Sequence, residues 1–255
     1  MAIVKIEGIV VGETLYSESS KILKVFTPKY GIISVMAKGC RKPKSIFREA
    51  SNKLIYANFD ISYKERGISN LVGVEIIKLF RNIIMDYRDL EKKMYAFSLI
   101  DLTFQVLNQH NNIDNNEEIY SIFLQSLIKI DEGLNPSIIT DIVKLKYLSY
   151  LGVKPSLKSC SNCGSTTNIV TLSSINYGFV CSNCYTNEKI VSSDTLKMIR
   201  MLECVDITRI KKLDIGEIER KEINEFLEEY YENNTGIYFS MDKKIKALSK
   251  IETVL

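Results

Sequence analysis

The sequence has one histidine and no tryptophan among its 255 residues. Histidine is the commonest general base and a frequent metal ligand, so triads and histidine-rich catalytic metal sites are hard to build here. The single histidine, His110, lies just past a long helical pattern, where a helix-end or loop residue is the ordinary interpretation. The patterns G-x-x-x-x-G-K-[ST], G-x-G-x-x-G and G-x-S-x-G are all absent. A Walker-type ATP site is therefore not expected.

Long hydrophobic runs are also missing. No run approaches 18 consecutive apolar residues, so we expect no membrane span. The opening MAIVKIEGIVV carries Lys5 and Glu7 inside its apolar run and lacks the regions of a secretory signal. We therefore expect a cytoplasmic protein. Its six cysteines are then reduced and available to a metal rather than to disulfides.

Charge is nearly balanced over the whole chain, with a net value of +3, but it is unevenly distributed. Residues 1–80 contain 13 Lys and Arg against 7 Asp and Glu, a net charge of +6. Residues 81–255 contain 21 against 24, a net charge of −3. Because a basic surface attracts polyanions, this asymmetry indicates a nucleic acid or another acidic partner for the N-terminal part.

The first 80 residues are typical of β structure, with apolar and polar residues alternating along short runs. The segment 27–31, TPKYG, joins two such runs, and its proline and glycine favour a hairpin turn. Five strands are expected near residues 3–12, 20–27, 31–38, 54–63 and 69–79. Five short antiparallel strands suit a small closed barrel of the OB-fold type. SH3-like barrels, which have similar strand counts, are the alternative.

From Arg81 onward the apolar residues repeat every 3.6 positions, which indicates helices. Helices are expected near residues 81–110, 116–131, 135–152, 193–203, 216–233 and 242–254. The third has Asn135 as N-cap, Pro136 at its first position and Gly152 just past its end. The fold class is therefore α+β multidomain. An OB-fold barrel at 1–80 precedes an all-α domain at 81–255, into which a cysteine module at 157–188 is inserted.

Two Cys-x-x-Cys pairs lie 17 residues apart, which is the spacing of a four-cysteine zinc ribbon. The predicted metal ligands are Cys160, Cys163, Cys181 and Cys184. Four thiolates close the tetrahedral shell of Zn²⁺, so one structural zinc ion is expected. No Lys, Arg, Asp or Glu lies between these cysteines. Since phosphates are bound by cations, direct nucleic-acid contact by the ribbon is the less favoured alternative. The other two cysteines are expected to act as small apolar residues: Cys40 and Cys204.

The segment AKGCRKPKSIFR, residues 37–48, carries five cations and no acidic residue. These candidate nucleic-acid-binding residues are Lys38, Arg41, Lys42, Lys44 and Arg48. In an OB barrel, the face of strands 2 and 3 and the adjoining loops bind nucleic acid. The alternative is an ordinary solvated loop. Bases stack on aromatic rings, and the sequence offers four candidates without distinguishing among them: Tyr16, Phe26, Tyr30 and Phe47.

Four features of the chain resemble the RecO family of bacterial recombination mediators and DNA repair proteins. The first is the opening IVKIEGIVVGETLYSESSKILKVFTPKYGIISVMAKGCRKPKS. The second is LKYLSYLGVKPSLKSCSNCG, a helix that runs into the first cysteine pair, and the third is INYGFVCSNC before the second pair. The fourth is the order of barrel, helices, inserted ribbon and helices. One departure is that Gly178 stands alone where the family often has two glycines.

The resemblance implies an N-terminal OB-fold and a helical domain that carries a four-cysteine zinc module. It further implies a protein without nucleotide cofactor that binds single- and double-stranded DNA and anneals complementary strands. Such a protein partners with RecR and helps to load RecA onto DNA coated by single-strand-binding protein. The family's basic loop corresponds to Lys38, Arg41 and Lys44, whereas Lys42 and Arg48 are added from their charge alone.

Three functions follow as hypotheses. The leading one is a DNA-binding and annealing mediator that is not an enzyme. The second is an adaptor whose helical and zinc region docks protein partners, suggested by the acidic helix 216–233 and the basic tail 241–250. In that hypothesis Lys243, Lys244 and Lys246 meet the acidic tail of single-strand-binding protein. The third is a hydrolase or nuclease that uses carboxylates and a divalent ion, which no pair of acidic residues favours.

Overall fold

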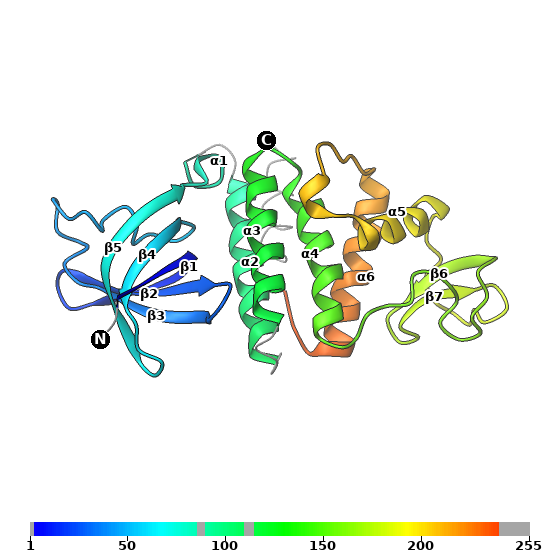
Figure 1. Ribbon diagram of the computed structural model, residues 1–255. Coiled ribbons are helices and arrows are strands. Elements are labelled where there is room, and N and C mark those ends of the chain that lie inside the picture. Colours follow the sequence, from blue (N-terminus) through cyan, green and yellow to red (C-terminus); the bar gives the residue numbers. More distant parts are fainter. Residues whose placement is uncertain (1–2, 86–89, 110–114, 240–255) are drawn as a thin grey trace. The chain divides into compact units, whose positions relative to one another are not determined.

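The structure, a computed structural model, describes residues 3–85, 90–109 and 115–239 (Figure 1). Packing divides the chain into two compact units. The first, which we call the barrel unit, comprises Met1–Arg88 and Asn111–Asp131. The second, the helical unit, comprises Asp89–His110 and Glu132–Leu255. The chain therefore leaves the barrel unit for one helix and returns to it before it completes the helical unit.

Five strands form the barrel, and each matches a predicted strand. They are β1 (Ile3–Tyr16), β2 (Ser20–Thr27), β3 (Gly31–Ala37), β4 (Tyr56–Ser62) and β5 (Ile68–Lys78). They close in the order β1-β2-β3-β5-β4, with β4 paired back to β1 (Figure 1). Every pair is antiparallel except β3 with β5, which is parallel. This OB-like closure confirms the predicted barrel.

The interior of the barrel follows from strand alternation. Leu23 and Val25 of β2 and Val35 of β3 are fully buried in its apolar core. Because successive side chains along a strand point to opposite faces, the residues that follow them in β2, Lys24 and Phe26, lie on the outer face. The strands approach closely at Gly8, where a Cβ atom would meet Val25 Cγ1 at 2.6 Å. Only glycine allows β1 to cross β2 at this distance.

Helix α3 (Asn116–Asp131) packs on the outer face of the barrel. The ring of Phe26 meets the rings of Tyr120 and Phe123, with centroid distances of 5.2 and 5.9 Å. Tyr120 also donates a hydrogen bond from its hydroxyl to Glu7 at 3.2 Å. Phe26 would otherwise expose a large apolar ring on the outside of the sheet, so this helix removes that surface from water.

The last residue of α3 is held by charge. Asp131 is buried and pairs with Lys78 at the end of β5, with an N–O distance of 2.9 Å. Its other carboxylate oxygen accepts a hydrogen bond from the backbone N–H of Asn82 at 3.0 Å. Asn82 belongs to the short helix α1 (Arg81–Ile84). Packing thus groups α1 and α3 with the barrel. The predicted domain boundary near residue 80 divides the chain by sequence order, and it stays a proposal.

The helical unit contains four helices, a two-stranded sheet and one 3-10 turn in its described part. They are α2 (Leu90–Gln109), α4 (Pro136–Tyr150), β6 (Ile169–Ser173), β7 (Gly178–Cys181), α5 (Ser193–Cys204), η2 (Ile207–Arg209) and α6 (Glu217–Thr235). The Asn135 side chain accepts hydrogen bonds from the backbone N–H groups of Ser137 and Ile138, which confirms the predicted N-cap of α4. No helix among the described residues is long and apolar enough to cross a bilayer.

The expected single helix over 81–110 was wrong. Helix α1 ends at a C-cap, Met85, and α2 begins at Leu90. The apolar residues keep helical spacing on both sides of this break, so periodicity alone does not reveal it. The expected helix near 242–254 lies outside the described residues.

We expect Phe123→Ala to destabilise the protein by about 3–5 kcal/mol, because it removes a fully buried ring from the contact between α3 and β2. Phe123→Leu keeps most of the apolar volume and should cost much less. Urea unfolding of the two variants beside the parent protein measures the difference. Equal, small losses would show that α3 does not depend on this contact.

Candidate functional site: a cysteine cluster and a basic segment

The four predicted ligand cysteines come together at one point of the helical unit. Their sulfur atoms all lie within 4.8 Å of one another, although 21 positions separate the first pair's Cys160 from Cys181. Four thiolates bound to one ion at about 2.3 Å would lie about 3.8 Å apart in a tetrahedron. The Cys163 and Cys181 sulfurs are 3.6 Å apart. The cluster therefore has the size and the donor set of a four-thiolate metal site.

Backbone turns bring each pair of cysteines to the same point. In the first, the N–H of Gly164 donates to the carbonyl of Cys160 at 2.9 Å, and Gly164 has a left-handed φ of 75°. In the second, the N–H of Cys184 donates to the carbonyl of Cys181 at 3.0 Å. Cys181 is the last residue of β7 and pairs with Ile169 of β6, so the small sheet fixes where the second turn begins.

The surroundings of the cluster favour a thiolate at Cys160. Burial raises the pKa of this thiol, but hydrogen bonds from the backbone of Cys181, Cys163 and Asn162 outweigh it and lower the pKa to about 6. The hydrogen bond with Cys163, together with burial, raises the pKa of Cys184 to about 12. Opposite shifts of this kind arise when neighbouring sulfurs share protons, and a divalent cation held by all four would replace those protons.

The cysteine module is attached to the rest of the helical unit on two sides. Ser156 exchanges backbone hydrogen bonds with the β7 edge, where it pairs with Gly178. A Cβ at Gly178 would overlap the backbone of Ser156, so this position requires glycine. On the other side, Arg200 of α5 donates to the carbonyl of Leu157 at 2.8 Å and lies over the ring of Phe179.

The residue before this glycine, Tyr177, has an unusual backbone conformation. Tyr177 has a left-handed φ of 59°, a conformation that glycine adopts more easily. Its ring packs edge-to-face on the ring of Tyr230 in α6, with centroids 6.3 Å apart. This contact gives the tyrosine ring a packing partner at a backbone conformation that favours glycine.

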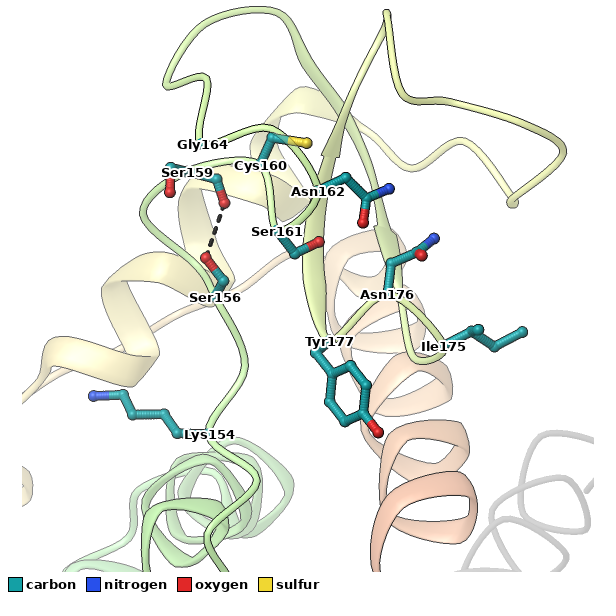
Figure 2. Close-up of a pocket in the computed structure, with 10 residues that line it drawn as sticks. All are labelled: Lys154, Ser156, Ser159, Cys160, Ser161, Asn162, Gly164, Ile175, Asn176 and Tyr177. Atoms are coloured by element: carbon teal, nitrogen blue, oxygen red, sulfur yellow. Dashed lines mark hydrogen bonds between the residues drawn. The ribbon is translucent and has the colours of Figure 1, made fainter.

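A shallow pocket of about 550 Å³ lies beside the cluster (Figure 2). Figure 2 shows Lys154 on one side, and Ile175 and Tyr177 on another, with serine and asparagine side chains between them. Lys154 is its one charged lining residue, and it is paired with Glu203. A pocket with no free cation among its described lining residues is poorly suited to phosphate.

The basic segment, residues 38–48, follows β3 on the barrel. All five of its predicted DNA-binding cations are exposed: Lys38, Arg41, Lys42, Lys44 and Arg48. In the part of the chain that the structure describes, none of them forms an ion pair. Their charge is therefore available to an external anion.

The basic segment is held in place although it has no regular secondary structure. Cys40 is only 1% exposed and belongs to the barrel core, which confirms its predicted apolar role. The N–H of Arg41 donates to the carbonyl of Ser19, at 2.9 Å, and the N–H of Gly39 donates to the hydroxyl of Ser20, at 3.1 Å. These contacts tie the segment to the turn between β1 and β2.

One cation and one cysteine correct the sequence prediction. Lys24 lies on the outer face of β2 and donates to Ser34 of β3 at 2.9 Å, so it adds a cation that the search for a charge run missed. Strand alternation was the signal that could have found it, because Lys24 lies between the buried Leu23 and Val25. Cys204 was wrongly expected to act as a small apolar residue: it is exposed, and its thiol donates a hydrogen bond to Glu203 at 3.0 Å.

Several predicted residues cannot be placed. Lys243, Lys244 and Lys246 of the basic tail lie outside the described residues, and so does His110.

The acidic helix 216–233 corresponds to α6, whose buried side is apolar and aromatic. Some of its carboxylates stabilise the fold. Glu222 accepts hydrogen bonds from Ser192, the N-cap of α5, and from Thr195 of α5, and Glu225 pairs with Lys189.

Comparison with known proteins covers nearly the whole chain. Residues 1–80 match the family model described as recombination protein O N terminal, and residues 87–241 match recombination protein O C terminal. The DNA repair protein RecO of Listeria welshimeri is 28% identical over 255 residues, which cover 98% of this chain and 97% of that protein. The proteins of the same name from Bacillus pumilus and Bacillus subtilis are 29% and 27% identical, with coverage of 99% and 98% of this chain and 97% of each relative. The chain belongs to the RecO family of DNA repair proteins.

Proposed function

We propose that this chain is a recombination mediator, not an enzyme, that binds single- and double-stranded DNA and anneals complementary strands. The observation that carries the proposal is the group of five exposed cations on the basic segment of an OB-like barrel, none of which forms an ion pair with another described residue. An OB barrel binds nucleic acid on the face of its second and third strands and the adjoining loops. The basic segment leaves the third strand, and Lys24 of the second strand extends the same charge.

Annealing follows from backbone contacts without base recognition. Two complementary strands repel each other through their phosphates, and cations that neutralise several phosphates on each reduce this repulsion. Contacts to phosphate fix the position of a strand but carry no sequence information, so the bases stay free to pair. A surface of lysine and arginine side chains is sufficient for this role and requires no catalytic group.

We further propose that the protein acts with RecR and helps to load RecA onto DNA coated by single-strand-binding protein. Membership of the RecO family supports these partners. Lys243, Lys244 and Lys246 remain the proposed contact for the acidic tail of single-strand-binding protein. Cytoplasmic, nucleoid-associated localisation is part of the same proposal.

We propose that the cysteine cluster binds one structural Zn²⁺. Cys160, Cys163, Cys181 and Cys184 would hold it, and a closed four-thiolate shell leaves no position for a water or substrate. When bound, the ion contributes folding free energy to the module. The residues themselves connect α4 to α5 through Ser156, Gly178 and Arg200, so the stability of the module supports the packing of the helical unit.

A second candidate is an adaptor function of the helical unit. The pocket beside the cysteines combines neutral hydrogen-bonding groups with two exposed apolar side chains, Ile175 at 76% and Tyr177 at 52%. That chemistry suits a protein segment better than DNA. For an adaptor, binding to protein partners would be stronger than direct binding to DNA, which would be weak.

Replacing Lys38, Arg41 and Lys44 together by glutamate should lower the affinity for single-stranded DNA and flatten its dependence on salt. If three phosphate contacts are lost, the slope of log affinity against log salt should fall by about 2. Fluorescence anisotropy over a salt series measures both quantities.

The matched control replaces Lys211, Lys212 and Lys221 by glutamate, which changes net charge equally at exposed positions of the helical unit. This variant should retain most of the affinity. An equal loss in both variants would mean that net charge matters rather than the basic segment, and unchanged binding in the first would exclude the segment as the DNA surface.

Cys160→Ser should abolish stoichiometric zinc, measured by atomic emission, and lower the melting temperature, because one thiolate ligand is removed. Cys204→Ser, at an exposed cysteine outside the cluster, should change neither. DNA affinity measured well below the melting temperature should be the same in all three proteins. A loss of DNA affinity without a loss of stability would instead make the ribbon a DNA contact.

A strand-annealing assay distinguishes the proposed functions. A mediator should accelerate annealing of complementary oligonucleotides at low salt, and less so as salt rises, because its phosphate contacts are screened. An adaptor should act only when single-strand-binding protein coats the strands. Labelled DNA incubated with Mg²⁺ should stay intact, and cleavage that increases with protein concentration would support a nuclease instead.

A further inference from the structure

The outer face of β1, β2 and β3 continues directly into the basic segment. Tyr16 at the end of β1 pairs with Ser20 at the start of β2. On the other side, the pairing of β2 with β3 ends at Lys21 and Ala37, and the N–H of Gly39 donates to the Ser20 hydroxyl, so Lys38 between them lies beside Ser20. Residues that pair directly across antiparallel strands point to the same face. Tyr16, Ser20 and Lys38 therefore form a row across the outer face.

The middle residue of this row is small, and the outer two are long. With neighbouring strands about 4.8 Å apart, Tyr16 and Lys38 are separated by about 10 Å across Ser20. Ser20 is itself buried, and its hydroxyl accepts from the Gly39 N–H. The surface is therefore low at Ser20, between the ring of Tyr16 and the ammonium group of Lys38.

The structure also distinguishes the four aromatic candidates. Phe26 is covered by α3, Phe47 packs against the barrel core, and Tyr30 stacks on Tyr63 with ring centroids 4.7 Å apart. Tyr16 is 52% exposed, and among the described residues of the barrel unit it is the one strongly exposed aromatic side chain. One large ring is therefore accessible beside the cations.

We propose that Tyr16 is a base-stacking residue of the DNA surface, and that it makes the protein prefer single-stranded to double-stranded DNA. The proposal rests on the DNA-binding function proposed above. A base stacked on the Tyr16 ring would leave its phosphate within reach of Lys38, and Lys24 lies on the same outer face for a neighbouring phosphate. Stacking of bases on aromatic side chains is largely independent of sequence, as a mediator requires.

The preference for single strands has a direct cause. In a duplex each base is already stacked on both faces and paired, so the ring of Tyr16 gains nothing unless a base is unstacked. The cations, in contrast, contact phosphates of either form. The lysines and arginines should therefore contribute to the affinity for both single-stranded and double-stranded DNA. Tyr16 should contribute only to the affinity for single-stranded DNA.

The experiment compares Tyr16→Ala, Tyr16→Phe and Leu15→Ala in the full-length protein. Leu15 is 65% exposed but points to the opposite face of β1, so its truncation controls for changes at the strand end. Anisotropy at fixed salt measures affinity for a labelled single strand and for a duplex of the same length. Tyr16→Ala should lose about tenfold in affinity for the single strand and none for the duplex, whereas the other two variants should bind as the parent does.

A single strand with abasic sites in place of its bases isolates stacking, since it keeps every phosphate. The parent protein should bind it as weakly as Tyr16→Ala binds the normal strand, and Tyr16→Ala should bind both strands equally. If Tyr16→Ala weakens single strand and duplex alike, or changes neither, Tyr16 does not stack on bases while the DNA-binding proposal stands. If the parent protein binds no DNA, both proposals fall.

Discussion

The register of β2 between β1 and β3 is the constraint on which the rest of the barrel unit depends. It directs Leu23 and Val25 inward and Lys24 and Phe26 outward. A shift by one residue would exchange the two faces, which would expose the core and bury a lysine. The inward residues fill the barrel, and the outward Phe26 needs the helix α3 to cover it. The other end of the same outer face stays open, and the basic segment begins there.

In the helical unit the corresponding constraint is the meeting of four sulfur atoms. Segments at Cys160 and Cys181 must approach within hydrogen-bond distance, and the amide of Cys181 lies 3.5 Å from the Cys160 sulfur. No charged residue occurs between the first and last cysteine, so neither ion pairs nor phosphate contacts compete for that loop. The cysteine cluster therefore lies in one unit and the basic segment in the other.

Sequence reasoning succeeded where a local pattern determines the structure. The alternation of apolar and polar residues predicted the five strands, and Asn135 predicted the start of α4. The spacing of the cysteines alone predicted that all four come together. It was wrong or silent where distant segments decide. The packing of α3 on Phe26 is not visible in the apolar period of either segment. Nor could composition separate an exposed Tyr16 from a covered Phe26, because both occur in similar strand patterns on the same face and only the packing of α3 distinguishes them.

The fixed geometry of the basic segment matters for what its charges can do. A free loop of lysines would lose backbone freedom on binding DNA, a cost that subtracts from the gain at the phosphates. Here the burial of Cys40 and the hydrogen bonds to Ser19 and Ser20 already order the backbone, so this cost would be small for the proposed DNA binding. The same bonds place the segment beside Tyr16. On the role proposed for Tyr16, a strand that follows the cations along the segment would be directed toward that ring, so that positioning by phosphates and discrimination by stacking would depend on the same few contacts.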